Sequence, residues 1–514
     1  MSSPTAAETD TLLSHWDFPH PPRNEQIQVM DWIDRKGVDK DFLSIEAPVG
    51  VGKSPVGVTF AQARGGSILV PQNSLQEQYL RDWPDIHHLR GTVHYSCHHG
   101  TANNPSCRRS KCDRKDMGVC PYSVAKHNFR QNAGSLTSYA MFLTLLLHGR
   151  PREDGEPLFI NPWLVCDESH QLDEAITKVS EVAFGDVEYT KHTTKAFPLF
   201  TPEDPMLFAD VVLNNLWDGL ERSIAAQKDE TPERLSWESL RDQIVMVLAE
   251  LARDPNAWVC DVSEDFQDRS RRFYVRPILP KSFFRKHLDG QFLILGMSAT
   301  PISPEVSRQI YGVDVDSFAV SSPFPVENRP IYYRPVAKMS YQNLAESVPV
   351  MGRAVSRTLS QFPDDKGIIH VSSFKLARDI YRCMDGAAQR RVLLHEPKKN
   401  RDDLLRQFRD AKGPVALMSP SISEGLDLKD DQGRFNIITK VPFPALNDPW
   451  IKARKNSIDG WYDWRTALSL AQASGRTTRH AEDYSTTVIL DASFSALYNN
   501  SRKHFPYWFQ EALQ

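Results

Sequence analysis

A loop at residues 46–54 combines the residue types that hold the phosphates of a nucleotide. It follows a short apolar run and precedes a helical pattern, which is the context that such a loop requires. Gly50 and Gly52 would let backbone N–H groups close around the phosphates, Lys53 would reach the β- and γ-phosphates, and the Ser54 hydroxyl would bind Mg²⁺. The loop is completed by Pro48, Val49 and Val51. We therefore predict that ATP and Mg²⁺ bind here; the alternative is a chance glycine turn.

Two acids, Asp167 and Glu168, come directly after the apolar run at residues 163–166. At the end of a buried strand, Asp167 would hold the Mg²⁺ ion and Glu168 would activate the attacking water as a general base. The alternative is an acidic helix cap after a strand. Together with Lys53, however, the two acids favour hydrolysis of a nucleotide.

Two arginines near the C-terminus, Arg476 and Arg479, are predicted to lie on one helix face at the end of the helical run 464–473. Arginine suits the negative charge that develops during phosphoryl transfer, because its guanidinium group is always charged and presents several donors. The pair could therefore reach the γ-phosphate from a second domain. The alternative is an ordinary solvated helix face.

The elements that must position these residues follow a rhythm of short apolar runs, each ending in small or polar residues and followed by a helical pattern. This rhythm predicts an α/β fold with parallel sheets. The two groups of runs separate near residue 325, at the proline-rich segment 321–325. Residues 175–265 are predicted to be an all-helical insertion, with one helix starting at Thr231-Pro232. The runs are Phe42–Ile45, Ser67–Val70, Trp163–Cys166, Phe292–Leu295, Gly367–Val371, Val415–Met418, Phe435–Ile438 and Thr487–Leu490.

Composition excludes some classes of protein. Apolar residues make up 40% of the 514 residues and charged residues 25%, which is incompatible with a largely disordered chain. The net charge is −4, so the total gives no sign of a nucleic-acid partner. The longest apolar stretch, residues 141–147, is far shorter than the roughly 20 residues of a membrane span. Residues 1–22 contain no Lys or Arg, so we expect no secretory signal, no membrane association and a cytoplasmic location.

Four of the seven cysteines cluster between residues 97 and 120, which predicts a metal or cluster site rather than disulfides. Four thiolates suit tetrahedral Zn²⁺ as well as an iron–sulfur cluster. Residues 97–130 also contain seven basic residues against two acidic ones. With Tyr122 and Phe129 as stacking groups, this segment is predicted to bind single-stranded DNA; the alternative is that a small lobe needs polar residues for solubility. The four cysteines are Cys97, Cys107, Cys112 and Cys120.

These features, in this order, resemble a superfamily 2 helicase of the iron–sulfur XPD/DinG type, and the resemblance covers nearly the whole chain. Ser138 departs from the family pattern, which has Asn there, and the cysteine spacing is tighter than in better-known members. Besides the nucleotide loop and the Asp-Glu pair, the segments that carry the resemblance are Arg23–Gln26, Val70–Gln78, Leu136–Ala140, Gly296–Thr300, Ser423–Asp427 and Gln472–Arg479.

The resemblance implies two RecA-like motor domains, at residues 1–325 and 326–514, with an iron–sulfur lobe at 90–130 and an arch-like helical insertion at 175–265. The stretch 271–286 would then supply a strand and a helix of the first motor domain, with its aromatic residues in the core. The resemblance also implies that His170 couples ATP to the second motor domain. The residues that it adds to the nucleotide site are Gln26, Asp427, Gln472 and Gly475.

The cofactors implied are ATP, Mg²⁺ and a [4Fe–4S] cluster held by the four cysteines. The implied activity is ATP-driven 5′-to-3′ movement on single-stranded DNA, with unwinding of forked or tailed duplexes by a monomeric, nucleoid-associated motor whose loading partner is unknown. The alternative is a DNA-dependent ATPase that remodels proteins on DNA, or a recruited DNA-binding scaffold with little unwinding.

Overall fold

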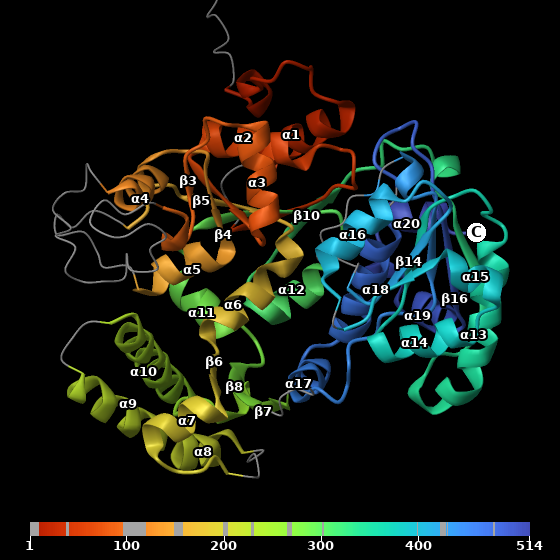
Figure 1. The fold of residues 1–514 in the computed structure, drawn as a ribbon. Coiled ribbons are helices and arrows are strands. Elements are labelled where there is room, and N and C mark those ends of the chain that lie inside the picture. Colours follow the sequence, from red (N-terminus) through yellow and green to blue (C-terminus); the bar gives the residue numbers. More distant parts are fainter. Residues whose placement is uncertain are drawn as a thin grey trace, which may run out of the picture.

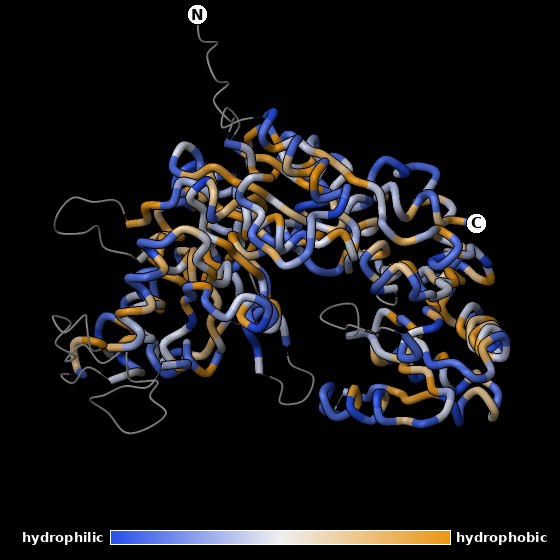
Figure 2. Tube along the Cα trace, turned by 90° about the horizontal axis from the view of Figure 1, so that it is seen from above, coloured by the Kyte–Doolittle hydropathy of each residue, from blue (hydrophilic) through white to orange (hydrophobic). Residues whose placement is uncertain are grey.

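The computed structural model describes residues 10–36, 41–95, 120–148, 158–198, 204–227, 231–264, 270–300, 303–397, 399–421, 428, 430–475 and 478–514. These residues form two parallel α/β halves and a third unit inserted into the first half (Figure 1). Apolar segments run through the interior of each half, whereas hydrophilic segments lie mainly at the periphery (Figure 2).

The first half is built on a seven-stranded parallel sheet with the strand order β10-β1-β9-β5-β2-β4-β3. Strand β9 lies between β1 and β5, pairing Ser298 with Glu46 and Met297 with Asp167. Because all strands run in one direction, the segments that follow β1, β5 and β9 meet at the same edge of the sheet. The strands are β1 (Phe42–Glu46), β2 (Gly66–Val70), β3 (His88–Leu89), β4 (Ser135–Ser138), β5 (Trp163–Asp167), β9 (Leu293–Ser298) and β10 (Asp316–Ala319).

Helices cover both faces of this sheet (Figure 1). The helices of the first half are α1 (Asn24–Lys36), α2 (Lys53–Arg64), α3 (Asn73–Asp82), α4 (Pro121–Gln131), α5 (Tyr139–His148), α6 (Leu172–Ser180), α11 (Lys281–His287) and α12 (Pro304–Tyr311).

The second half contains a six-stranded parallel sheet with the order β11-β16-β15-β12-β14-β13. Its strands are β11 (Ile331–Ala337), β12 (Gly367–His370), β13 (Val392–Leu394), β14 (Ala416–Ser419), β15 (Phe435–Ile438) and β16 (Thr486–Asp491). Its helices are α13 (Leu344–Leu359), α14 (Phe374–Arg382), α15 (Gly386–Arg391), α16 (Arg401–Asp410), α17 (Pro449–Ser457), α18 (Trp461–Ser474), α19 (Ser493–Ser501) and α20 (Tyr507–Ala512). All eight predicted apolar runs are strands, so the prediction of parallel α/β sheets is confirmed.

The insertion is not all-helical, and that prediction is wrong. It contains the antiparallel sheet β6-β8-β7, formed by β6 (Val182–Gly185), β7 (Trp258–Glu264) and β8 (Arg271–Pro277). Alternate side chains of these short strands, such as Phe273 and Val275, are buried against helices of the insertion. Its helices are α7 (Asp186–Thr193), α8 (Pro205–Phe208), a π-helical turn at Ala209–Leu213, α9 (Asn214–Ala226) and α10 (Pro232–Leu251).

Two finer predictions about this region have opposite outcomes. Helix α10 does begin where predicted, and the Thr231 hydroxyl accepts a hydrogen bond from the Arg234 N–H at 3.2 Å. Strand β8, by contrast, belongs to the small antiparallel sheet and not to the parallel sheet of the first half. Phe283 and Phe284 of α11 are buried in the core of the first half, as predicted, whereas Phe273 is buried in the core of the insertion and Tyr274 is only partly buried.

The two halves share a core. Ile458, Trp461, Trp464 and Leu468 of the second half pack in one hydrophobic cluster with first-half residues such as Phe42. The segment α17–α18 is therefore packed against the first half as well as its own sheet. Among the described residues, no helix is both long and apolar enough to cross a membrane.

Candidate functional site

The loop after β1 has the backbone that a phosphate-binding loop requires. Gly50 and Gly52 have φ angles of 90° and 83°, in the left-handed region that glycine adopts without strain. Lys53 and Ser54 begin helix α2, so N–H groups of the helix terminus face the space where phosphates would lie. The Lys53 ammonium donates to the Ala47 carbonyl at 3.0 Å, which folds the side chain back over the loop.

Two residues ahead of β1 support this loop from behind. Gln26 is buried, and its amide donates to the Gly52 carbonyl at 3.0 Å while accepting from the Arg23 N–H at 2.8 Å. The Arg23 guanidinium donates to the Gly50 carbonyl. Gln26 was predicted to contact the nucleotide, and the structure gives it contacts that fix the loop itself.

The two acids after β5 lie at the same sheet edge as the loop. Asp167 is buried; its Oδ1 accepts from the Glu168 N–H at 2.9 Å and its Oδ2 accepts from the Tyr79 hydroxyl at 2.8 Å. Burial, together with the adjacent Glu168 charge, raises the pKa of Asp167 to about 6, and the Lys53 ammonium opposes that rise. The structure therefore brings Lys53 and Asp167 together as predicted.

Tyr79 and Tyr139 are site residues that sequence reasoning missed. Tyr79, on α3, also contacts Ser54, and burial raises its pKa so far that the hydroxyl stays a hydrogen-bond donor. The Tyr139 hydroxyl donates to the Asp167 carbonyl at 2.8 Å. Tyr139 lies in one of the segments that carry the family resemblance. Tyr79 has only the pattern of a buried aromatic on a helix, which gives no sign of its partner.

His170 connects three separate segments. Glu168, in a left-handed conformation, places its Oε2 3.3 Å from His170 Nδ1, and the Ser298 hydroxyl lies 2.9 Å from the same nitrogen. The amide nitrogen of Gln472 lies 2.7 Å from His170 Nε2. Because an amide N–H can only donate, we assign Nε2 as the acceptor and place the imidazole proton on Nδ1. Gln472 therefore connects the second half to the Glu168 side of the site.

The prediction that Arg476 and Arg479 share a helix face is wrong, because α18 ends at Ser474 and Arg479 lies beyond it. The Gly475 N–H closes the last helical turn on the Ala471 carbonyl, and Asp483 accepts from the Arg479 N–H at 2.9 Å, which takes the chain out of the helix. Arg476 and Asp427 lie outside the described residues.

A pocket joins the nucleotide loop to the second half. The Trp508 indole N–H donates to the Ala299 carbonyl at 3.0 Å, which ties α20 to the segment after β9. The Phe324 ring packs directly over Gly50, so that a Cβ at Gly50 would lie 2.0 Å from it. Predicted site residues of both halves thus meet here. The lining residues include Pro48, Val49, Phe324, Gly475, Thr478 and Trp508.

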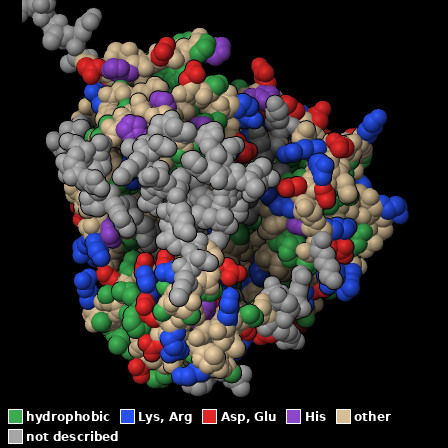
Figure 3. Space-filling model, turned by 60° about the vertical axis from the view of Figure 1, so that its left-hand side comes forward, with side chains coloured by type: hydrophobic (Ala, Val, Ile, Leu, Met, Phe, Trp, Pro, Cys, Tyr) green, Lys and Arg blue, Asp and Glu red, His purple; other side chains and the backbone are tan. Residues whose placement is uncertain are grey.

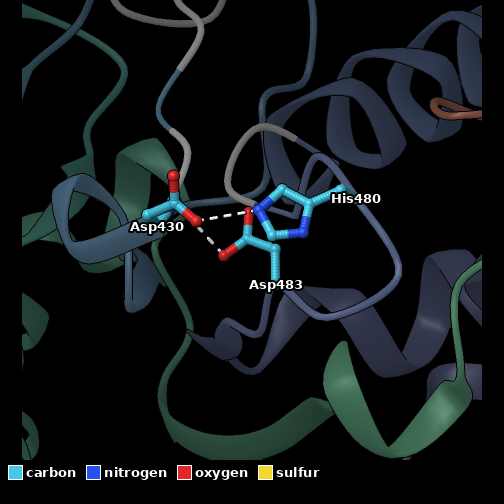
Figure 4. Close-up of side chains that lie close together, drawn as sticks. All are labelled: Asp430, His480 and Asp483. Atoms are coloured by element: carbon cyan, nitrogen blue, oxygen red, sulfur yellow. Dashed lines mark hydrogen bonds and ion pairs between the residues drawn. The ribbon is translucent and has the colours of Figure 1, made fainter.

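Asp430, His480 and Asp483 converge beside the segment that follows α18 (Figure 4). His480 Nε2 lies 2.8 Å from the Asp430 carboxylate. The buried Asp483 carboxylate accepts from the Asp430 N–H, from Arg434 and from the Arg479 N–H. These donors account for the placement of Asp483, which joins the segment near residue 430 to the one carrying Arg479.

The surface between the halves has a basic groove, which sequence reasoning did not identify as one site. Arg401, Arg406 and Arg409 of α16 line it together with Asp402 of the same helix and with Gln72 and Ser74 of the first half. Elsewhere, charged side chains of both signs are interspersed on the face shown in Figure 3, in keeping with the small net charge.

Of the predicted cluster ligands, Cys120 is half-buried and directly precedes α4, whereas Cys97, Cys107 and Cys112 lie outside the described residues. Phe129 of α4 is fully buried in the core of the first half, so its assignment as a DNA-stacking residue is wrong. Tyr122 is only partly buried, and its ring centre lies 5.6 Å from the ring centre of Tyr95.

Comparisons with known proteins bear on the family. Residues 356–512 match the family described as Helicase C-terminal domain. A 108-residue match, 34% identical, relates the chain to the Regulator of telomere elongation helicase 1 homologs of Drosophila grimshawi and Drosophila melanogaster. It covers 18% of this chain and 11% of each relative, so the chain spans about a tenth of the length of these curated relatives.

Two solved structures share the fold over almost the whole chain. One is named XPD_Helicase, with a TM-score of 0.58 and 15% identity, and covers 94% of this chain and 97% of that one. The other is Xpd4 of S. tokodaii, with a TM-score of 0.57 and 13% identity. This match covers 94% of this chain and 99% of the Xpd4 chain. The predicted resemblance is therefore confirmed at the level of the fold: the chain shares the two RecA-like domains of these XPD structures, and residues 356–512 match the Helicase C-terminal domain family.

Proposed function

We propose that this protein is an ATP-dependent DNA helicase whose site lies between motor domains at residues 1–325 and 326–514. The observation that carries the proposal is the contact of His170 with Glu168 on one side and Gln472 on the other. This contact gives the second motor domain a direct connection to the residue that would activate water. A nucleotide-binding protein without a motor function would not need it.

Each residue has a distinct task in the proposed hydrolysis. Lys53 would leave the Ala47 carbonyl to neutralise charge on the β- and γ-phosphates, while Glu168 would accept the proton of the attacking water. When bound, Mg²⁺ supplies positive charge at the phosphate oxygens, and Ser54 and Asp167 would hold it. Arg476 and Arg479 would stabilise the charge that develops on the transferred phosphoryl group from the second domain.

The basic groove supports DNA as the polymer on which the motor moves. Arg401 and Arg409 lie on the second half, and Gln72 and Ser74 on the first, so a strand along the groove would contact both motor domains. Arginine contacts to phosphates supply affinity that falls as salt rises. Alternating contacts of the two domains with the strand during hydrolysis would move it in one direction. By family resemblance this direction is 5′-to-3′ on single-stranded DNA, and the movement would unwind forked or tailed duplexes.

The first experiment compares the wild type with Lys53→Ala. ATP hydrolysis stimulated by single-stranded DNA should be lost in the variant, while DNA affinity at low salt stays within about threefold, because Lys53 is not among the residues that line the groove. Unchanged hydrolysis in Lys53→Ala would refute the site.

A second experiment tests the groove. Arg409→Ala should lower the magnitude of the salt slope of DNA binding by about 0.7, the value for one phosphate contact on a single strand. Val245→Ala, at an exposed residue of the insertion, serves as its control.

A protein-remodelling ATPase is the second candidate, because the same site and groove would serve it. Strand displacement on a forked duplex separates the two functions, since a remodeller would hydrolyse ATP on single strands without separating the fork.

We also propose that Cys97, Cys107, Cys112 and Cys120 hold a [4Fe–4S] cluster. About four irons per chain with absorption near 400 nm would support the cluster, and one zinc without colour would refute it.

A further inference from the structure

A buried ion pair joins the two halves close to the proposed site. Arg454 Nη2, on α17, lies 2.9 Å from Asp173 Oδ2, on α6. The Arg454 side chain is 0% exposed and that of Asp173 is 6% exposed. None of the steps proposed above uses this pair.

Aromatic side chains surround the Arg454 guanidinium. It packs against two indole rings that are nearly perpendicular to each other, with its central carbon 4.6 Å from the Trp450 ring centre and 4.9 Å from that of Trp461. The Trp450 indole N–H donates to the Pro277 carbonyl of the insertion at 2.8 Å. The pair is therefore surrounded by the first half, the insertion and the second half.

The position of Asp173 gives the pair its significance. Asp173 is in the first turn of α6, three residues after His170, so the helix that carries it continues directly from the acids of the site. Arg454 lies shortly before α18, and the last turn of α18 contains Gln472, which contacts His170. The segment α17–α18 is thus attached to residues 167–173 at two points, one buried and one at the site.

We propose that Asp173 and Arg454 are positioning residues for ATP hydrolysis: they form the fixed point of attachment that sets Gln472 against His170. The inference rests on the proposed function. Separating a buried ion pair leaves an uncompensated charge in the core, so this attachment stays closed throughout the cycle. The bond between Gln472 and His170 joins neutral groups, costs far less to break, and is the contact that opens and closes.

The test compares Asp173→Asn with Glu174→Gln. Glu174 is the next residue of α6 and also pairs with an arginine of the second half, Arg465 at 2.5 Å, but its side chain is 46% exposed. Exposed pairs of this kind contribute little. In DNA-stimulated ATP hydrolysis, Asp173→Asn should lower kcat at least tenfold with KM for ATP within twofold, and Glu174→Gln should resemble the wild type.

A double variant distinguishes positioning from general destabilisation. If Asp173 acts through Gln472, Asp173→Asn combined with Gln472→Ala should lose no more kcat than the more severe single variant. The proposal would be overturned if the kcat losses of the two single variants multiplied in the double variant. It would also be overturned if Asp173→Asn behaved like Glu174→Gln.

A further variant covers the case that Asp173→Asn does not fold. Arg454→Lys keeps the charge opposite Asp173 but loses the planar group that packs against the indoles, and should lower kcat three- to tenfold at unchanged KM. Wild-type kcat in Arg454→Lys would then overturn the proposal. Failure of the proposed function would look different, because DNA-stimulated hydrolysis that depends on Lys53 would be absent from the wild type itself.

Discussion

His170 Nε2 and the amide nitrogen of Gln472 lie 2.7 Å apart although 302 residues separate them in the chain. The other ring nitrogen of His170 faces Ser298 and Glu168, so one imidazole connects the acid of the proposed site, the segment after β9 and the end of α18. A change at Gln472 therefore alters the hydrogen bonding of Glu168 through a single side chain.

Gln472→Ala should lower kcat for DNA-stimulated ATP hydrolysis about tenfold while KM for ATP changes less than twofold. The variant removes one hydrogen bond, about 1 kcal/mol, and frees the imidazole that orients Glu168. Steady-state kinetics on saturating single-stranded DNA would measure the effect. Gln309→Ala is the matched control, because Gln309 also bridges the halves, by accepting from the Asp459 N–H at 2.9 Å, but this hydrogen bond is exposed to solvent. Equal losses in both variants would contradict a specific role for Gln472.

Tyr79→Phe should raise KM for Mg-ATP about tenfold. The variant removes the hydroxyl that donates to the Asp167 carboxylate, so the pKa of Asp167 rises further and the carboxylate becomes a poorer magnesium ligand. Titrating hydrolysis with Mg²⁺ at fixed ATP would measure the change. Tyr139→Phe removes an equally buried hydroxyl that donates to the backbone carbonyl of Asp167 instead. It should lower the unfolding free energy by about 1 kcal/mol without changing the Mg²⁺ requirement.

Gly50→Ala should weaken ATP binding at least tenfold. The φ of 90° at Gly50 is strained for alanine by about 1–2 kcal/mol, and the new methyl group would collide with the Phe324 ring. Binding of a fluorescent ATP analogue would show the loss. Gly413→Ala is the control, because nothing lies within 4 Å of a Cβ there. Adding Phe324→Ala to Gly50→Ala should restore only part of the affinity, since it removes the collision and leaves the backbone strain.

Glu46→Gln should stabilise the protein above pH 7. Burial at the end of β1 raises the pKa of Glu46 to about 7 from an ordinary 4.5. Between these values the native state keeps a proton that the unfolded chain has lost, so wild-type stability falls as pH rises through this window. The variant does not titrate, so its free energy of unfolding should exceed that of the wild type by about 3 kcal/mol at pH 8.5 and by nothing near pH 4. Urea unfolding at the two pH values would measure this difference, and a constant difference would contradict the assignment.

The sequence predicted much of the fold from local patterns. Short β-rich runs such as Trp163–Cys166 are buried on both faces, so they are visible in the sequence as consecutive apolar residues. Where the pattern was short and mixed, as in β6 and β7, the prediction of helix failed, because alternating residues in a short strand resemble a helix face. Arg479 was misplaced for a related reason: the hydrogen bond that Asp483 accepts from its backbone is not visible in helical spacing.

The sequence by itself determined which residues could do chemistry: the loop at 46–54, the acids Asp167 and Glu168, and their order along the chain. Each depends on neighbours a few residues apart, which fix local backbone geometry. Only the tertiary structure decided their partners. Tyr79 beside Asp167, Gln472 beside His170 and the buried pair of Asp173 and Arg454 result from packing between distant segments. Such contacts form because parallel strands and shared cores bring sheet edges together, and no local pattern in the chain records which edge a side chain will face.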